Sequence, residues 1–261
     1  MTATLLAACG VSQQQEVQIG QEQAAQVNQQ LPILNDPVVN NYVNQLGQQI
    51  ASPTPRSDLQ WSFAVVNTND VNAFALPGGF VYVNRGVLER ASNESEVAAV
   101  LGHEIEHVVL RHSVKQMEQM QGANVGAAVL CTLTSVCNSG LGQAGIQAAG
   151  GLVFAKFSRT DEQQADEGGF QNVINAGINP TGMLTFFQKL LAEEQQSGGG
   201  GATAGWFSDH PGTSDRIADV ERMLSQVPQS ELSRLRTNTT AFNQMKSRLA
   251  QLPPPPRTSS R

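Results

Sequence analysis

Three of the four histidines in this 261-residue chain lie within the stretch "LGHEIEHVVLRH", residues 101–112. His103 and His107 are four residues apart, and Glu104 follows the first of them. On an α-helix this spacing puts both imidazoles on one face, roughly 40° and 6 Å apart, so their nitrogens can converge on one zinc at about 2.0–2.1 Å. Glu104 lies at the edge of that face, where it can take a proton from a water that zinc activates. The motif therefore predicts a hydrolytic zinc site.

The alternative is an ordinary amphipathic helix whose histidines belong to a solvated face. Glu106 and Arg111 favour such a face. Five apolar residues around the motif predict that the helix is mostly buried: Val100, Leu101, Val108, Val109 and Leu110. Titratable groups on a buried helix need a partner or a ligand, which favours the zinc site. His112 lies five residues past His107, about 140° round a continuous helix, so we expect a structural histidine that points away from the metal.

A catalytic zinc of this kind needs a third protein ligand and an open position. No further histidine follows closely, so we expect a carboxylate from a later helix. The stretch "SRTDEQQADEGG" supplies Glu162 and, four residues on, Asp166 on the same helical face. Asp161 and Glu167 are neighbouring carboxylates that compete for the role. The residues alone leave the third ligand open between them.

The pattern HExxH followed by S-R-x-x-E-x-x-A-D resembles the zinc metallopeptidases of the CAAX prenyl endopeptidase and HtpX type, and more closely their soluble periplasmic members. The resemblance covers roughly residues 30–225. It implies that Glu162 is the third ligand and that Asp166 orients a ligating histidine. It gives Arg159 an orienting role rather than a chemical one.

A second segment matches the same family. Residues 72–88, "NAFALPGGFVYVNRGVL", would on their own predict a hairpin. They are similar to the family's edge-strand segment. The resemblance implies that the backbone around Asn72, Ala73 and Phe74 pairs with an extended substrate as an added strand.

A third segment, "DHPGTSDRI" at residues 209–217, resembles the family's H-P-x-x-x-x-R element. It implies that His210 donates to the oxyanion of the tetrahedral intermediate, or occupies the fourth zinc position in a resting form. Arg216 is expected to pair with Asp166 or with a substrate carboxylate. A surface salt bridge is its alternative.

The elements that must position these residues can be read from periodicity and capping. We expect strands in residues 59–67 and 72–88 and a helix opened by Asn93 and Glu96. Further helices are predicted at 37–51, 161–177, 180–197 and in segments between 214 and 252. The fold class is therefore a mostly helical α+β protein, and the family resemblance makes it zincin-like, with a small edge-exposed sheet over the HExxH helix.

Composition excludes some partners. The formal net charge is −6 and the pI is near 5.2, which argues against nucleic-acid binding. No run of 18 apolar residues exists, so we expect no membrane-spanning segment and no cleavage of prenylated proteins within a bilayer.

The N-terminal residues and the cysteines suggest export. "LLAAC" at residues 5–9 resembles a lipobox that would make Cys9 a lipid anchor, but few residues precede it and none is basic. Either the natural chain starts upstream, or the likeness is accidental. Cys131 and Cys137 are somewhat more compatible with a disulfide than with free thiols. We divide the chain into a lipobox-like leader and Gln-rich tether (1–30), a metallopeptidase domain (31–252) and a Pro-rich disordered tail (253–261).

Two functions fit these expectations. The first is an endopeptidase with one zinc per chain, held by His103, His107 and Glu162. It would cleave unfolded or extended polypeptides, in quality control in the periplasm or cell envelope of a bacterium. The second is a catalytically latent zinc-binding envelope chaperone or assembly factor, with the zinc blocked by His210. The presence of Glu104, which a pure binder would not need, favours the enzyme.

Overall fold

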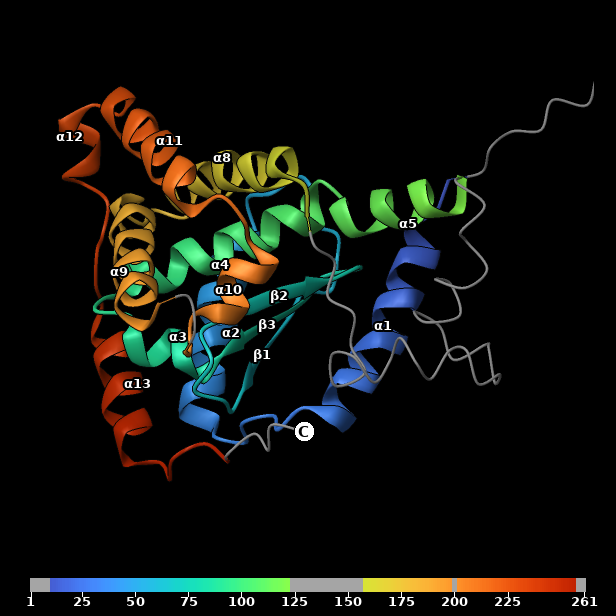
Figure 1. The fold of residues 1–261 in the computed structure, drawn as a ribbon, viewed down its shortest axis with the longest axis horizontal. Helices are drawn as coiled ribbons and strands as arrows, with labels where there is room; N and C mark the ends of the chain where they lie inside the picture. Colours follow the sequence, from blue (N-terminus) through green and yellow to red (C-terminus); the bar gives the residue numbers. More distant parts are fainter. Residues whose placement is uncertain (1–9, 123–156, 199–200, 257–261) are drawn as a thin grey trace, which may run out of the picture.

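A computed structural model describes residues 10–122, 157–198 and 201–256 (Figure 1). The strands are β1 (Ser62–Val66), β2 (Ala73–Leu76) and β3 (Phe80–Asn84). The helices are α1 (Gln13–Gln30), α2 (Pro37–Ala51), α3 (Arg85–Arg90), α4 (Glu94–Val109), α5 (His112–Gly122), α8 (Arg159–Asn175), α9 (Thr181–Ser197), α10 (Ala204–Asp209), α11 (Thr213–Gln226), α12 (Gln229–Leu232) and α13 (Thr240–Gln251). The mostly helical α+β class with a small sheet is confirmed.

The sheet has the strand order β1-β3-β2, with β1 parallel and β2 antiparallel to β3. Gly78 and Gly79, with φ of 78° and 96°, form the tight turn that joins β2 to β3, as the Pro-Gly-Gly sequence predicts. Side chains alternate between two faces. One face joins the main core with α2 and α4, whereas Phe74 and Tyr82 on the other face pack with Ala24 of α1.

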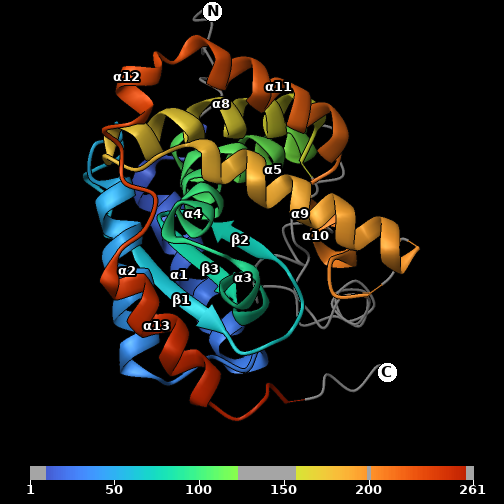
Figure 2. The same cartoon turned by 90° about the vertical axis from the view of Figure 1, so that its left-hand side faces the viewer.

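Helix α4 lies between the sheet and α8 (Figures 1 and 2). The side chain of Asn93 caps it by accepting a hydrogen bond from the Glu96 N–H at 3.2 Å, as the sequence predicts. Helix α8 crosses α4 at glycines: a Cβ on Gly169 would lie 2.8 Å from the backbone nitrogen of His103. Because the two backbones approach so closely, α8 is held at a fixed position beside the HExxH residues.

The HExxH helix ends earlier than predicted, at Val109 rather than near residue 112. Arg111 adopts a left-handed conformation (φ 57°), and α5 begins at the next residue. Glu106 does not lie on a solvated face either. Glu106 is buried and accepts a hydrogen bond from the Asn172 amide of α8 at 2.7 Å, and Arg111 pairs with Glu16 of α1 at 2.8 Å.

The Gln-rich N-terminal segment forms α1, opened by a capping box between Ser12 and Gln15. The helix packs closely on the sheet, because a Cβ on Gly20 would overlap the carbonyl oxygen of Pro77. The lipobox cysteine and the expected Cys131–Cys137 disulfide lie outside the described residues. The division into three parts stays a prediction.

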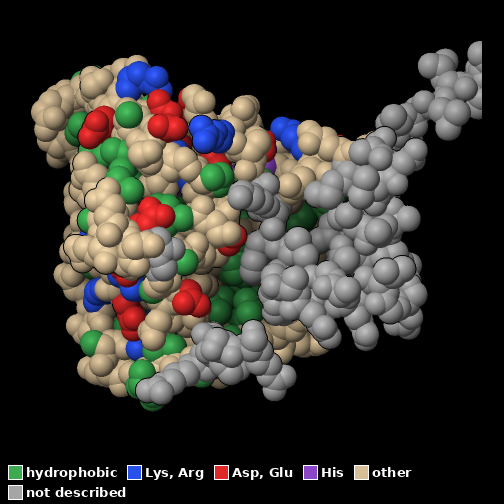
Figure 3. Space-filling model, viewed as in Figure 1, with side chains coloured by type: hydrophobic (Ala, Val, Ile, Leu, Met, Phe, Trp, Pro, Cys, Tyr) green, Lys and Arg blue, Asp and Glu red, His purple; other side chains and the backbone are tan. Residues whose placement is uncertain are grey.

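On the face shown in Figure 3, acidic and basic side chains are interspersed and no large area of one sign stands out. Among the helices that the structure describes, none is both long and apolar enough to cross a bilayer.

Candidate metal centre

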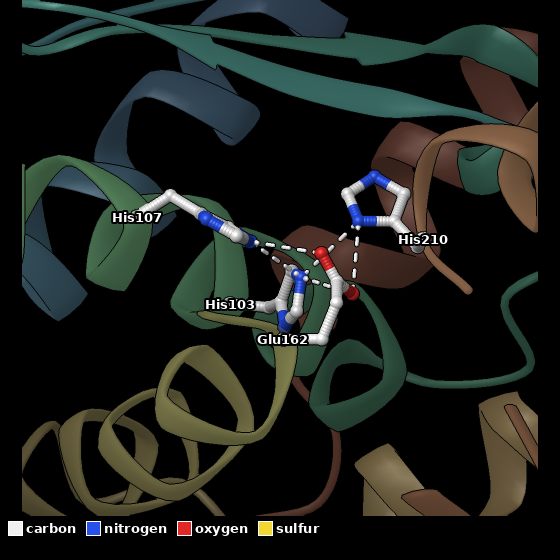
Figure 4. Close-up of side chains that lie close together, drawn as sticks. All are labelled: His103, His107, Glu162 and His210. Carbon is white, nitrogen blue, oxygen red and sulfur yellow. Dashed lines mark hydrogen bonds and ion pairs between the residues drawn. The ribbon is translucent and has the colours of Figure 1, made fainter. Parts of the chain in front are cut away.

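Four side chains from three separate elements converge beneath β2 (Figure 4). His103 and His107 come from α4, Glu162 from the first turn of α8, and His210 from the C-terminal cap of α10. The Nε2 atoms of the two α4 histidines lie 3.0 Å apart. The two oxygens of Glu162 face one nitrogen each: Oε2 lies 3.5 Å from the Nε2 of His103, and Oε1 lies 3.5 Å from the Nε2 of His107.

His210 completes the cluster from the other side. Its Nδ1 lies 3.3 Å from the Nε2 of His103 and 3.3 Å from the Oε2 of Glu162. All four donor atoms lie within 4.8 Å of one another, and all four side chains are buried. The structure therefore brings the three predicted ligands and His210 into one group.

The donor set fits zinc. Zn–N distances of about 2.0–2.1 Å in a tetrahedral site imply ligand–ligand separations of roughly 3.3–3.4 Å, close to the distances between these atoms. Two or three imidazoles with one carboxylate are typical of catalytic rather than structural zinc. Among the described residues this is the one His/Cys/Asp/Glu cluster close enough to hold a metal.

Asp166 and Arg216 support the centre from behind. The Nδ1–H of His103 can donate to the Oδ1 of Asp166 at 2.9 Å, which leaves the Nε2 of that ring unprotonated toward the cluster. Arg216 binds both oxygens of Asp166, at 2.6 and 2.7 Å, and its Nη1 lies 2.8 Å from Glu162. Arg216 is buried, so of its predicted partners the structure shows Asp166 and excludes a surface salt bridge.

Glu104 is fully buried beside the donor set. Neither of its carboxylate oxygens accepts a hydrogen bond from the described residues, and the Nε2 of His210 lies 3.6 Å from Oε1. Burial raises the pKa of Glu104, while His210 and His103 oppose that rise. A carboxylate with no protein donor and a raised pKa is suited to receive a proton.

Two of the other titratable groups of the cluster, His107 and Glu162, are in metal-binding forms, whereas His210 is protonated at neutral pH. Burial lowers the pKa of His107 to about 3, so its imidazole is neutral. Burial acts to raise the pKa of Glu162, but His210 and His103 hold it well below its usual value. For His210 burial acts to lower the pKa, but Glu162 and then Glu104 raise it to about 9. The centre thus combines a neutral imidazole and an ionised carboxylate, as zinc requires.

The N-terminal end of β2 is in contact with the segment that contains α10. The Nε2 of His210 lies 3.3 Å from the carbonyl oxygen of Ala73, and the side-chain amide of Asn72 donates to Asp209 at 2.8 Å. Just before the strand, the N–H of Val71 donates to the carbonyl of Ala202. Two of the three residues expected to pair with substrate therefore already contact this segment. Pairing at Asn72, Ala73 and Phe74 stays a prediction.

Some residues behave differently from the sequence expectations. The side chain of Arg159 is exposed and faces Asp215 at 3.8 Å, so an orienting role for it is not supported. His112 does not point away from the site, because its Nδ1 lies 2.9 Å from the Nδ1 of His107. The prediction for His112 was wrong because it assumed one continuous helix, whereas α4 ends at Val109 and α5 begins at His112.

Two aromatic residues next to the centre were missed. The ring of Phe157 stacks on His107 with centroids 4.0 Å apart, and buried Trp206 lies 4.6 Å from the ring of His210. Neither belongs to a motif with a metal-binding meaning, so the sequence carried no signal for them.

Comparison with known proteins agrees with this geometry. The model of the family described as "Peptidase family M48" matches residues 37–224. The chain is 31% identical, over 225 residues, to the Beta-barrel assembly-enhancing protease of Escherichia coli (strain K12). That alignment covers 82% of this chain and 44% of the relative, so the chain spans less than half the length of that protein.

Two further relatives are similar over shorter regions. The Metalloprotease LoiP of Escherichia coli (strain K12) is 32% identical over 168 residues, 63% of each chain. The Mitochondrial metalloendopeptidase OMA1 of Schizosaccharomyces pombe (strain 972 / ATCC 24843) is 33% identical over 186 residues, 71% of this chain and 53% of the relative. All three names describe proteases.

Proposed function

The chain belongs to peptidase family M48, and on that premise we propose that it is a zinc-dependent endopeptidase that hydrolyses extended polypeptides. The observation that carries the proposal is the buried carboxylate of Glu104, which accepts no hydrogen bond from the described residues and lies beside a buried donor set of His103, His107, Glu162 and His210. A domain that only stored zinc would gain nothing from burying a carboxylate without a donor, since burial of an unpaired polar group costs stability.

Zinc, when bound by His103, His107 and Glu162, would polarise the scissile carbonyl and activate a water. The chain's own groups perform the proton transfers. Glu104 takes a proton from the attacking water and passes it to the leaving amine as the C–N bond breaks. His210 supports the negative charge that develops on the carbonyl oxygen through an N–H donor. Asp166 and Arg216 hold His103 in position throughout.

We infer the substrate class from the sheet. Strand β2 is an edge strand in the order β1-β3-β2, and an extended peptide added at its outer edge would be recognised mainly through its backbone. Backbone recognition selects unfolded or extended segments rather than one sequence. Pairing near Ala73 requires that the His210 contact with its carbonyl be released or shared.

We further propose that the protein acts in the bacterial cell envelope. Two observations support this: the sequence similarity to the Beta-barrel assembly-enhancing protease and the lipobox-like residues 5–9. The likeness to CAAX prenyl endopeptidase and HtpX-type enzymes, and more closely to their soluble periplasmic members, is proposed on the H-P-x-x-x-x-R and S-R-x-x-E-x-x-A-D segments. Lipid attachment at Cys9 and a Cys131–Cys137 disulfide remain part of this proposal.

A catalytically latent zinc-binding factor is the second candidate. The observation in its favour is His210, whose Nδ1 lies at ligand–ligand distance from both His103 and Glu162. If His210 occupied the fourth zinc position permanently, no water would reach the metal.

Casein cleavage by the purified chain, at equal zinc occupancy, separates the two candidates. Wild type should cleave, Glu104→Gln should not, and Glu167→Gln, the same change at an exposed site on α8, should behave like wild type. If wild type and Glu104→Gln both hold one zinc and neither cleaves, the endopeptidase proposal fails in its simple form. Cleavage by His210→Ala alone would then show that His210 blocks the centre, and no cleavage by any variant would favour the latent factor.

A further inference from the structure

His112 forms a buried contact with one of the proposed zinc ligands. Its Nδ1 lies 2.9 Å from the Nδ1 of His107, and its Nε2 lies 3.2 Å from the amide oxygen of Gln164. A carboxylate oxygen of Asp161 lies 3.7 Å from the same Nε2. His112 is 2% exposed, so water does not compete for these contacts.

One assignment of protons satisfies all of these contacts. The oxygens of Gln164 and Asp161 can only accept, so the Nε2 of His112 carries a hydrogen. In the neutral ring the Nδ1 of His112 is then bare and accepts the Nδ1–H of His107. The Nε2 of His107 is left unprotonated, and it faces His103 and Glu162.

The backbone reaches this arrangement through an unfavourable conformation. Arg111 is the one non-glycine residue with positive φ in the described part of the chain, and Cβ makes the left-handed region unfavourable for it. On a continuous helix His112 would lie about 140° from His107. The left-handed turn instead starts α5 at His112 and directs its ring back to the ligand.

Helix α1 stabilises this turn. The guanidinium of Arg111 binds the carboxylate of Glu16 at 2.8 Å, and the same fully buried carboxylate binds Arg56 at 3.3 Å. The Nη2 of Arg111 also donates to the carbonyl of Val11. A charged group from a distant segment therefore holds the residue whose conformation places His112.

We propose that His112 is a positioning residue for the metal centre: it accepts the Nδ1–H of His107 and so fixes the tautomer that leaves Nε2 free for zinc. The inference rests on the zinc centre of the proposed function. It gives His107 a support from α5 that corresponds to the support Asp166 of α8 gives His103. Partners of this kind are worth about 10–100-fold in metal affinity.

Two substitutions separate the hydrogen bond from the volume of the ring. His112→Phe removes the acceptor and keeps a ring, whereas His112→Asn keeps an acceptor near the position of Nδ1. Zinc affinity is measured by competition with a chromophoric chelator, and the tautomer of His107 by ¹⁵N NMR of the metal-free protein. We expect His112→Phe to weaken zinc binding about 10–100-fold and to populate the Nε2–H tautomer. His112→Asn should stay near wild type in both.

Gln164→Leu provides a variant at an exposed position, where folding is not at risk. It should weaken zinc binding less than His112→Phe, because Asp161 remains beside Nε2. Phe157→Leu is the matched control, since it removes packing from His107 without changing its hydrogen bond.

Unchanged zinc affinity and tautomer in His112→Phe would overturn the proposal. So would equal losses in His112→Phe and His112→Asn, since they would show a packing role only. Zinc affinity could depend on His112 as expected while the wild type cleaved no casein. The peptidase proposal would then fail, and the role of His112 would stand. If wild type bound no zinc, the tautomer measurement on the metal-free protein would still decide the role of His112.

Discussion

Among single residues, Asp166 links a proposed zinc ligand to a buried arginine. Its carboxylate accepts from the ring of one proposed ligand, His103, and binds Arg216 through both oxygens. Burial acts to raise the pKa of Asp166, but Arg216 and His103 hold it below the usual value. The Asp166–Arg216 pair is buried, and Arg216 also contacts Glu162. A change at Asp166 therefore affects the whole centre.

Asp166→Asn should therefore be strongly destabilising. The amide leaves the buried Arg216 without one of its two carboxylates, and breaking a buried pair costs about 3–5 kcal/mol. Urea unfolding of the metal-free protein measures the change. Asp219→Asn is the control, because its pair with Arg222 is exposed and worth about 0–1 kcal/mol. Equal small effects for both variants would contradict the structural role of Asp166.

At the scale of elements, the crossing of α4 and α8 decides whether Glu162 reaches the two histidines. Gly169→Ala should push the helices apart, because its Cβ would lie 2.8 Å from the nitrogen of His103. Overpacking of this kind costs about 1–3 kcal/mol, and the displaced carboxylate should weaken zinc binding. Unfolding and chelator competition test both effects.

Gly205→Ala on α10 is the matched control for that substitution. Its Cβ would meet only the amide of Asn72, at the ordinary contact distance of 3.8 Å. We expect it to leave stability unchanged or slightly higher, since alanine favours a helix. If Gly169→Ala were as mild as Gly205→Ala, the close crossing would not be what positions α8.

The capping of α2 should make stability depend on pH. Burial acts to raise the pKa of Asp36, but the Val39 N–H and Arg248 of α13 lower it below its usual value. Because the folded pKa is the lower one, this contribution is present above the unfolded pKa of about 3.9 and is lost as pH falls through the folded pKa.

Asp36→Asn keeps a capping side chain but removes the charge. At pH 7 the substitution should lower the free energy of unfolding by up to about 1 kcal/mol, since Arg248 is partly exposed. It should have no effect at a pH where Asp36 of the wild type is protonated. Urea unfolding at several pH values, on the metal-free protein so that zinc release does not contribute, measures the difference. A difference that did not shrink as the pH falls below the unfolded pKa of about 3.9 would contradict the assignment of the effect to this carboxylate.

Helices and strands could be predicted from the sequence where local signals were strong. Only part of the site could be predicted in the same way. The Asn93 cap, the Pro-Gly-Gly turn and the spacing of His103 and His107 are local features, and each one is present in the structure. Glu162 could not be chosen over its neighbours from residue types alone, because the choice depends on how α8 crosses α4.

The turn at Arg111 and the burial of Glu106 were missed for a related reason. Both depend on contacts made by residues far away in the chain, Glu16 for the first and Asn172 for the second. Helical periodicity assigns a face to each residue but does not say which helix will cover that face. The position of His112 followed from the same missing information.

For the whole molecule, zinc should stabilise the fold, because the proposed ligands come from α4 and α8 and meet only in the folded chain. Binding at a free zinc concentration 100 times Kd contributes about 2.7 kcal/mol. For a chain of this size each kcal/mol shifts Tm by roughly 2–4 °C. Removal of zinc with a chelator should therefore lower Tm, as measured by calorimetry. An unchanged Tm would show that the centre is not occupied by zinc in the purified protein.

The sequence separation of the donors also has a kinetic consequence. His103 and His210 are 107 residues apart, and each must be delivered by a separately folded element. Closing a loop of that length has an entropic cost that local contacts do not have, so we expect the centre to be completed late in folding. A nascent or partly folded chain contains the HExxH helix but not the assembled donors. The proposed endopeptidase activity would therefore require a folded chain, and it would appear only when the molecule itself is no longer an unfolded polypeptide.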